Sequence, residues 1–422
     1  MIPQGYKQTE IGVIPEDWDC VRFGEKVKIY RGGSPRPIQN YITTSSDGFN
    51  WIKIGDVGEN DKYIHSTQEK IIPEGVSKSR EVHVGDFILS NSMSFGRPYI
   101  LGIDGCIHDG WLTIQDYKNT FATEYLYYLL SSDQIYRQYL CMAAGSSVKN
   151  LNKDKVSALN VIYPAIPEQE HIAEALSDVD STISSLEKLI AKKKAVKQGA
   201  MQELFTGKKR LPGFNGAWEK CTLSDLCYLI TKQTGFDYTN EIKPSLVEEN
   251  SIGTIPFIQN KDFNGKNINI KTDYYIPRDV AAKYPRILLD ETCLLISLSG
   301  RIGNVGLFEK FKGMAFIGGA VGICRFNNEQ NAEWCMLYLQ SSLGQKQIFE
   351  CQKSGAQHNL TVEDVRKLVI TLPATIEEQL AIASILSDMD NEIEALEQKL
   401  AKTRQIKQGM MQQLLTGKIR LK

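Results

Sequence analysis

The most constraining feature of this 422-residue chain is a long segment that occurs twice. Residues 172–180 read IAEALSDVD, and residues 382–390 read IASILSDMD, 210 positions later. At the same offset the match continues without a gap as far as TGKKRL at 206–211 and TGKIRL at 416–421. A chain built in this way is a tandem duplication, so we expect it to fold as two similar halves.

Both copies of the segment have the apolar spacing of a coiled-coil helix. Apolar residues recur at alternating steps of four and three, which is the a/d pattern that faces one partner helix. We expect each copy to form a helix of about 38 residues, roughly 57 Å long, with the other copy as its partner. The predicted seam consists of Ile172, Leu176, Val179, Ile183, Leu186, Ile190, Ile382, Leu386, Met389, Ile393, Leu396 and Leu400.

The segments between the repeated helices share a skeleton. Trp218 takes the place of Trp18, and Phe257-Ile258 followed by Asp262 repeats Trp51-Ile52 followed by Asp56. Short runs of β-type residues separated by glycine loops, together with a few helices, predict a mixed α/β fold for each segment. The local patterns predict a strand over 82–89, a helix from a Thr123 cap to about Met142 and a helix over 331–353. The chain order is therefore globule, helix, globule, helix.

The ends of the two repeats differ in an informative way. The first copy runs on through PGFNGAW into the second globule, whereas the second copy stops at TGKIRLK. The missing continuation is found at the N-terminus as EIGVIPEDW. We therefore expect the termini to lie close together, in a pseudo-circular and pseudo-two-fold molecule whose long helices are antiparallel.

Composition and motifs indicate a binding scaffold without catalysis. No apolar run approaches the ~18 residues that a membrane span needs, and the N-terminus has no signal-peptide pattern, so we expect a cytoplasmic protein. The nine cysteines are scattered and the five histidines do not cluster with them, so we expect free thiols and no metal site. Neither a nucleotide-binding phosphate loop nor a Gly-x-Ser-x-Gly nucleophile motif occurs, so we expect no catalytic residues.

Charge is nearly balanced, with 49 basic and 50 acidic residues, which argues mildly against a nucleic-acid partner. The distribution is uneven, however, because acidic residues concentrate in 168–187 and lysines in 188–197. We interpret Lys192-Lys193-Lys194 and the pair Asp178 and Asp180 as solvated helix faces. An acidic helix can mask basic surfaces elsewhere in the chain.

Taken together, these segments resemble the specificity subunits of type I restriction-modification systems. The resemblance covers essentially the whole chain. It depends on IPEQEHIAEALSDVD with QGAMQELFTGKKRLPGF, on EEQLAIASILSDMD with KQGMMQQLLTGKIRL, and on the leader YKQTEIGVIPEDW. It implies target recognition domains at 1–163 and 211–372, and coiled-coil spacers at 164–210 and 373–422.

The resemblance also implies a function and a set of partners. Each recognition domain would read one half of a split, gapped site in double-stranded DNA. The helices would dock two methyltransferase (modification) subunits, which recruit restriction subunits. This chain would hold no cofactor, since S-adenosylmethionine, ATP and Mg²⁺ would act in the partner subunits.

The candidate DNA-binding residues are polar and basic side chains in the glycine loops of both globules. Arginine suits guanine edges, glutamine suits adenine edges and lysine most often contacts phosphates. The candidates are Arg31, Ser34, Arg36, Lys53, Ser92, Ser94, Arg97, Lys232, Gln233, Lys261, Ser299, Arg301, Gln357 and His358. We assign the aromatic residues Trp51, Trp111 and Tyr128 to the core instead.

Two other functions remain open on the sequence alone. The first is a coiled-coil adaptor that joins two protein partners and never contacts DNA, which the flat net charge favours. The second is an enzyme fused to its own recognition domains, which the missing methyltransferase motifs disfavour. Arginine and serine at matched loops of both globules favour a DNA-binding protein.

Overall fold

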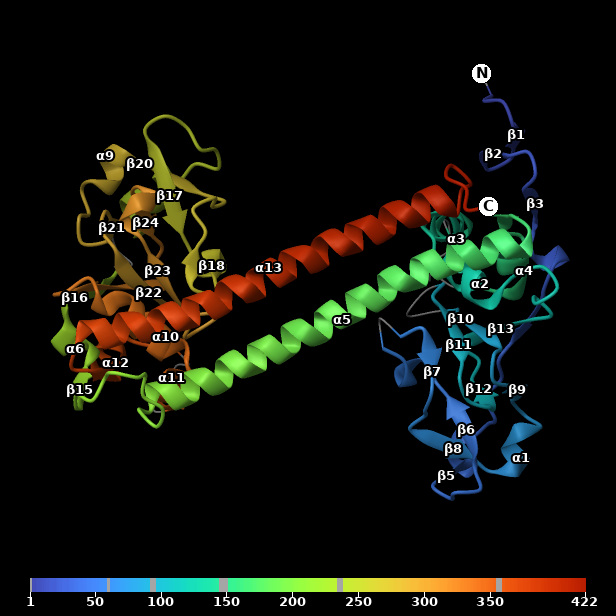
Figure 1. The fold of residues 1–422 in the computed structure, drawn as a ribbon, viewed down its shortest axis with the longest axis horizontal. Coiled ribbons are helices and arrows are strands. Elements are labelled where there is room, and N and C mark those ends of the chain that lie inside the picture. The colour runs from blue at the N-terminus through green and yellow to red at the C-terminus, as the bar shows by residue number, and fades with distance from the viewer. Residues whose placement is uncertain (1, 59–60, 92–95, 144–150, 234–237, 354–358) are drawn as a thin grey trace. The chain divides into compact units, whose positions relative to one another are not determined.

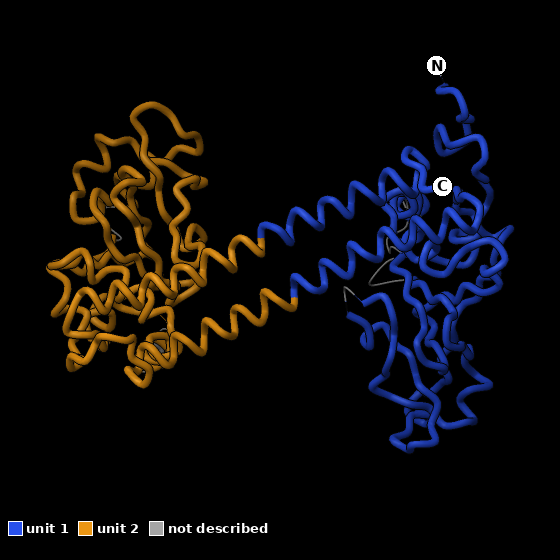
Figure 2. Tube along the Cα trace, viewed as in Figure 1, with its two compact units in different colours: residues 1–187, 398–422 blue, residues 188–397 orange. Residues whose placement is uncertain are grey.

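The computed structural model describes residues 2–58, 61–91, 96–143, 151–233, 238–353 and 359–422. Contacts within the chain divide it into two units (Figure 2). Unit 1 consists of residues 1–187 and 398–422, and unit 2 consists of residues 188–397. Each long helix contributes one part to each unit.

Unit 1 contains two five-stranded sheets (Figure 1). The first has the order β4 (Lys28–Arg31), β13 (Trp111–Gln115), β10 (Phe87–Ser90), β11 (Pro98–Leu101) and β7 (Tyr63–Ile64). The second has the order β5 (Ile42–Thr43), β8 (Glu69–Ile71), β6 (Phe49–Ile52), β12 (Gly105–Ile107) and β9 (Arg80–Val82). Two smaller ladders pair β1 (Tyr6–Thr9) with β2 (Gly12–Pro15) and β3 (Asp19–Arg22) with β14 (Asn160–Tyr163).

The central strand β10 is buried on both faces. Phe87 and Leu89 point into the main core of the unit, whereas Ile88 between them belongs to a second cluster with Tyr99 and Trp111. Successive side chains of a strand point to opposite faces, so a strand covered on both sides needs a continuous apolar run. The sequence FILS supplies that run.

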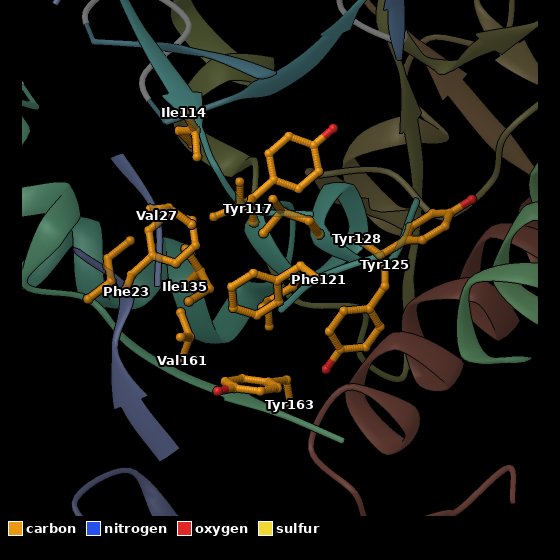
Figure 3. Close-up of a cluster of buried hydrophobic side chains, with 14 of the residues drawn as sticks. Phe23, Val27, Ile114, Tyr117, Phe121, Tyr125, Tyr128, Ile135, Val161 and Tyr163 are labelled. Atoms are coloured by element: carbon orange, nitrogen blue, oxygen red, sulfur yellow. The ribbon is translucent and has the colours of Figure 1, made fainter. Parts of the chain in front are cut away.

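The main core of unit 1 lies between the first sheet and the helices. Phe121 is its centre, with ring centroids 5.9 Å from Phe23 and 4.8 Å from Tyr163 (Figure 3). The α-helices of the unit are α1 (Pro73–Val76), α2 (Thr123–Leu130), α3 (Asp133–Ala143), α4 (Lys153–Ser157), the first part of α5 (Ile166–Phe205) and the last part of α13 (Ile376–Leu414). The predicted core positions of Trp51, Trp111 and Tyr128 are confirmed, since all three are at most 2% exposed.

Several local predictions for these elements were wrong. The run 82–89 is two strands, β9 and β10, because Gly85 takes a left-handed conformation (φ 87°) and turns the chain between them. The helix predicted from Thr123 to about Met142 is broken into α2 and α3, with Ala122 as the N-cap in place of Thr123. At the break, the Ser131 hydroxyl donates to the carbonyl of Tyr127 (2.7 Å), which satisfies an end of α2.

Unit 2 repeats this topology. Its larger sheet has the order β16 (Cys227–Lys232), β25 (Val321–Phe326), β22 (Cys293–Ser297), β23 (Val305–Phe308), β19 (Asn267–Ile268) and β18 (Phe263–Asn264). Its second sheet has the order β20 (Tyr275–Pro277), β17 (Thr254–Ile258), β24 (Ala315–Ile317) and β21 (Leu288–Leu289). A two-stranded ladder joins β15 (Trp218–Thr222) to β26 (Val369–Pro373).

The helices of unit 2 follow the same plan. They are the last part of α5, α6 (Leu223–Leu226), α8 (Lys243–Ser245), α9 (Arg278–Ala281), α10 (Asn331–Gln340), α11 (Ser342–Lys353), α12 (Val362–Lys367) and the first part of α13, with a π-helical turn at Tyr238–Ile242. The helix predicted over 331–353 is therefore also two helices. Ser341 lies at the break, and its hydroxyl contacts the carbonyl of Tyr338.

In unit 1 a half-buried arginine, paired with a buried glutamate, fastens the tail of α13 to the start of α5. The Arg420 guanidinium donates to both carboxylate oxygens of Glu168 (2.6 and 2.7 Å) and to both oxygens of Asp17 (2.8 Å each). Its carbon lies 5.7 Å from the ring centre of Trp18. The hydrogen bonds from Arg420 lower the pKa of Asp17 to about 2. One arginine thus joins a helix start, a helix tail and the entry to β3.

Unit 2 has the same arrangement at the tail of α5. Arg210 donates to both carboxylate oxygens of Glu378 (2.7 and 2.8 Å) and lies 5.6 Å from the ring centre of Trp218. Glu378 is only 2% exposed. The predicted equivalence of Trp218 with Trp18 is therefore visible in the contacts of each.

The two long helices also form ion pairs within each unit. These are Asp180–Lys407 (2.6 Å) and Glu187–Arg404 (2.6 Å) in unit 1, and Lys197–Asp390 (2.6 Å) and Lys194–Glu397 (2.7 Å) in unit 2. In both units, the α5 residue with the higher number pairs with the α13 residue with the lower number. The paired segments of α5 and α13 therefore run antiparallel. Each pair of unit 1 has an equivalent in unit 2: the acidic residue lies 210 positions later, on α13, and the basic residue lies 210 positions earlier, on α5.

Both chain termini lie in unit 1, and their segments contact each other. The Tyr6 hydroxyl donates to the carbonyl of Gly417 (3.2 Å). Gly417 has a positive φ of 70°, and an added Cβ there would lie 2.5 Å from the Pro15 ring. The turn after α13 therefore requires glycine because the N-terminal segment packs directly against it.

The contribution of Arg210 to stability can be tested by urea unfolding followed through tryptophan fluorescence. Replacing Arg210 by leucine leaves Glu378 buried without its partner, and we expect a loss of about 3 kcal/mol of unfolding free energy. The control is Arg404→Leu, which breaks a pair whose side chains are 56% and 42% exposed. That variant should lose less than about 1 kcal/mol. Equal losses in the two variants would contradict the assignment.

Candidate nucleic-acid interface

The glycine loop of unit 1 lies where β4 and β12 end. The amide of Gly32 donates to the carbonyl of Trp111 (2.9 Å), and that of Gly33 donates to the carbonyl of Ile107 (3.1 Å). A Cβ on Gly32 would lie 2.0 Å from the carbonyl oxygen of His108. The loop needs glycine here because two backbones touch, and their contact holds the loop on the edge of the sheets.

Three of the predicted DNA-binding residues meet at Asp109. The Ser34 hydroxyl donates to Oδ1 of Asp109 (2.8 Å), Nη2 of Arg36 approaches Oδ2 (3.4 Å), and Nε of Arg31 donates to the main-chain carbonyl (3.3 Å). The hydrogen bond from Ser34 lowers the pKa of Asp109, so this carboxylate is charged at neutral pH. Both arginines remain exposed. We call this set, Arg31, Ser34, Arg36 and Asp109, the Asp109 cluster.

Lys53 lies at the same edge but has its own partner. Strands β6 and β12 are parallel, with Ile52 opposite Ile107, so the residues that follow both strands emerge side by side. The Lys53 ammonium pairs with Glu69 (2.7 Å). Its charge is thus partly neutralised within the unit, as that of Arg36 is by Asp109.

The remaining predicted residues of unit 1 follow β10. Ser92 and Ser94 lie outside the described residues. Arg97 is half-buried, and its backbone closes the end of the hairpin, since its amide donates to the Ser90 hydroxyl (3.0 Å). Asn91 connects this hairpin to the Asp109 cluster by donating from Nδ2 to the carbonyl of Asp109 (2.8 Å).

Unit 2 presents the corresponding edge with different side chains. Lys232, at the end of β16, is exposed, and Gln233 after it is only 3% exposed. The edge contains a cavity of about 530 Å³. Its lining consists of Lys232, Gln233, Tyr238, Phe257, Gln259, Gly318, Gly319 and Ala320. Neither amide atom of Gln233 has a hydrogen-bond partner among the described residues.

The other predictions for unit 2 are spread around this edge. The ammonium of Lys261 pairs with Asp273, and the backbone carbonyl of Ser299 accepts a hydrogen bond from Asn260. Arg301 is exposed on the same β22–β23 loop as Ser299. Gln357 and His358 lie outside the described residues. Thus Lys232 and Gln233 line the cavity, whereas Lys261 has a carboxylate partner of its own.

Sequence reasoning missed two residues at these edges. Asp109, which contacts three residues of the glycine loop of unit 1, lies two positions after β12 and was not singled out. Gln259 follows β17 just as Lys53 follows β6, and both begin a turn closed by an aspartate, Asp262 or Asp56. Gln259 could have been found from the sequence. The match of Phe257-Ile258 to Trp51-Ile52 makes Gln259 the sequence equivalent of Lys53.

A series of contacts attaches the first sheet of unit 1 to the long helices. Lys62, at the start of β7, pairs with Glu124 and lies 4.7 Å from the ring centre of Tyr128. The Tyr128 hydroxyl donates to Asp180 (2.8 Å), which in turn pairs with Lys407 (2.6 Å). The interpretation of Asp180 as a solvated residue was therefore wrong, since a buried tyrosine on α2 reaches it.

In unit 2 a lysine beside the equivalent short strand also contacts a long helix. Lys266, next to β19, donates to the Ser387 hydroxyl on α13 (3.3 Å), and Ser387 donates to Glu333 on α10 (3.2 Å). The lysine run on α5 is partly paired as well, with Lys193 bound to Glu392 (2.6 Å). Both units therefore attach a sheet to the long helices through a lysine that precedes the equivalent short strand.

The twelve predicted seam positions are all buried or half-buried. Ile172 and Leu176 belong to the core of unit 1 together with Leu414. Ile382 and Leu386 belong to the core of unit 2, together with Leu204 and its neighbours at the end of α5. The first seam residues of each helix thus pack into a globule as well as facing the other helix.

Over the described ranges, no helix is long and apolar enough to cross a membrane. The same residues contain no group of three or more histidine, cysteine, aspartate or glutamate side chains placed to hold a metal ion.

Comparison with known proteins identifies two matching domains. The family described as "Type I restriction modification DNA specificity domain" matches residues 15–196 and again 215–405. The type I restriction enzyme MjaVIII specificity subunit of Methanocaldococcus jannaschii is 25% identical, over 99% of this chain and 97% of that protein. A protein provisionally named as the MjaX specificity subunit of the same organism is 27% identical over the same shares.

Solved structures share the fold. A chain from a structural study of complex assembly and conformational transition of the type I R-M system superposes with a TM-score of 0.60 and 18% identity, over 96% of this chain and 99% of that chain. The type I restriction-modification S subunit from M. genitalium gives a TM-score of 0.55 and 14% identity, over 94% and 96% of the two chains. At these identities the likeness establishes the fold alone.

The role of Asp109 can be tested by hydrogen exchange. Replacing it by alanine removes the acceptor of Ser34 and Arg36, so amides in the 31–37 loop should exchange about tenfold faster, as expected for losing roughly one hydrogen bond. The measurement is mass-spectrometric exchange on the peptide that contains the loop. Glu69→Ala, which frees Lys53 at the same edge, should leave this peptide unchanged. Equal acceleration by both variants would contradict the Asp109 cluster.

Proposed function

This chain belongs to the type I restriction modification DNA specificity family, whose domain it contains twice. From this membership we propose the following function. The chain is a sequence-specific DNA-binding specificity subunit of a type I restriction-modification complex. Each globule reads one half of a bipartite, gapped site. The family match favours this function over an adaptor that joins two proteins without contacting DNA.

The observation that supports the proposal is the pair of equivalent edges. In unit 1 the edge carries Arg31 and Arg36, held by Asp109, and the fork of arginine donors matches the two acceptors of a guanine edge. In unit 2 the edge carries Lys232 beside Gln233. Lysine suits a phosphate, which positions the domain without reading sequence. The same fold position with different side chains suits two readers of different sequences.

The recognition domains proposed are residues 1–163 and 211–372, separated by the helical regions 164–210 and 373–422. The antiparallel ion pairs within each unit support a coiled-coil spacer with pseudo-two-fold symmetry. The contact of Tyr6 with Gly417 supports a pseudo-circular chain. The spacer fixes the distance between the two half-sites.

The catalytic steps belong to partner subunits in this proposal. Two methyltransferase subunits dock on the helical regions and recruit restriction subunits, and these partners hold S-adenosylmethionine, ATP and Mg²⁺. The chain itself supplies no catalytic residue and no cofactor site. Such a complex acts on chromosomal DNA, so the protein works in the cytoplasm.

Gel-shift titration with the methyltransferase subunit present tests DNA recognition. Neutralising phosphates releases counterions, so the logarithm of the affinity should fall linearly with the logarithm of salt concentration, with a slope of about −0.9 per phosphate contacted. One sequence should compete far better than scrambled DNA of equal length. Affinity that depends on neither salt nor sequence would contradict the proposal and revive the adaptor.

The spacer can be tested by lengthening both helices together. Inserting one heptad after Leu189 and another after Lys399 preserves the antiparallel register and adds about 10 Å of helix. We expect the unread gap to grow by about three base pairs, at about 3.4 Å per base pair, while both half-sites keep their sequences. Methylome sequencing of the host measures both. A gap of unchanged length would contradict the role of the helices as a spacer.

A further inference from the structure

The cavity of unit 2 contains a polar side chain that the fold leaves without a partner. Gln233 is 3% exposed, and neither its amide nitrogen nor its amide oxygen forms a hydrogen bond with any described residue. Lys232 and Gly319 beside it are exposed, so the cavity opens to the surface. A buried amide without partners destabilises the free protein, and such groups are rare in native structures. A ligand that pairs with the amide would remove this cost.

The equivalent edge of unit 1 shows why the Gln233 amide has no hydrogen-bond partner among the described residues. There, the residue two positions after β12 is Asp109, whose carboxylate accepts the Ser34 hydroxyl and binds the loop after β4. In unit 2 the residue two positions after β24 is Gly319, which has no side chain. A Cβ at Gly319 would lie 3.6 Å from the amide oxygen of Gln233. In unit 2, therefore, no side chain stands beside the Gln233 amide at the position that Asp109 occupies in unit 1.

The hydrogen-bonding groups of the amide limit which base it can bind. It offers one donor and one acceptor side by side, which matches the N6 donor and N7 acceptor of adenine in the major groove. Guanine presents two acceptors there, and thymine and cytosine each present one hydrogen-bonding group, so none of them satisfies both atoms. Lys232, exposed at the mouth of the cavity, is placed to contact a phosphate of the same strand.

We propose that Gln233 is a specificity-determining residue, which reads one adenine in the half-site recognised by the second globule. The inference depends on the proposed function, since it names one letter of the sequence that this domain reads. It adds a specific residue, a specific base and the half-site to which that base belongs.

The test uses the full chain together with its methyltransferase subunit and methylome sequencing of the host. Gln233→Leu keeps the approximate size of the side chain but removes both polar atoms. We expect one A·T position of the second half-site to lose discrimination about tenfold or more, while every other position stays the same. Gln233→Glu should shift preference at that position toward cytosine, because a carboxylate accepts from its N4 amine.

A matched control is Gln379→Leu. Gln379 is also 3% exposed in unit 2, but its Nε2 donates to the carbonyl of Pro373 (3.1 Å) at the start of α13, outside the cavity. This variant should leave the methylation motif unchanged. The melting temperature of the free chain provides a second readout: Gln233→Leu should not lower it, whereas Gln379→Leu should, because only Gln379 loses a hydrogen bond.

The outcomes separate the inference from the function. A gapped wild-type motif that Gln233→Leu leaves unchanged would overturn the inference and keep the function. Loss of a guanine, or of a letter in the other half-site, would also overturn the inference. A wild-type chain that directs no sequence-specific methylation would instead overturn the proposed function itself.

Discussion

The structure of each unit depends on one half-buried guanidinium. Arg420 in unit 1 and Arg210 in unit 2 come from the tail of one long helix and bind a buried glutamate at the start of the other. Each also lies over the tryptophan that leads into its globule. Burying Glu168 raises its pKa, but the hydrogen bonds from Arg420 outweigh this and lower it overall. Without the arginine, the glutamate would be an uncompensated buried charge.

This constraint explains how a duplicated chain can support different recognition surfaces. The arginine, its glutamate and the tryptophan define where the helices and the globule meet, and they are the same in both units. Lys62 and Lys266 then attach the sheet to the helices. The loops at the far ends of the parallel strands make none of these contacts. Their side chains can therefore differ without disturbing the attachment of the sheet to the long helices. Loops positioned by a rigid scaffold are a common place for binding residues.

The Asp109 cluster and the cavity at Gln233 illustrate this freedom. Both lie where parallel strands of the smaller sheet end beside the first strand of the larger one. Unit 1 places Asp109 there, whose carboxylate binds Ser34 and Arg36 and whose main-chain carbonyl binds Arg31, and unit 2 has a glycine at the equivalent position. One backbone framework thus presents a basic surface in one unit and an amide in the other.

Much of the fold could be predicted from the sequence because its determinants are periodic or duplicated. The apolar spacing identified both long helices, and the repeat paired Trp218 with Trp18. The breaks at Ser131 and Ser341 were missed, since hydroxyl contacts with the preceding turn leave no trace in apolar spacing. Asp109 and Gln259 were missed for a different reason: their neighbours come from strands distant in sequence, which only the sheet register brings together. The partner of Asp180 was likewise non-local.

The central claim is that two different readers, held by one duplicated scaffold, recognise two half-sites at a fixed separation. The most direct measurement is methylome sequencing of a host with and without this chain. The account predicts a methylated motif that depends on the chain and has two unlike half-sites separated by a gap of constant length. A continuous palindromic motif, or a methylome that does not change when the chain is removed, would contradict it.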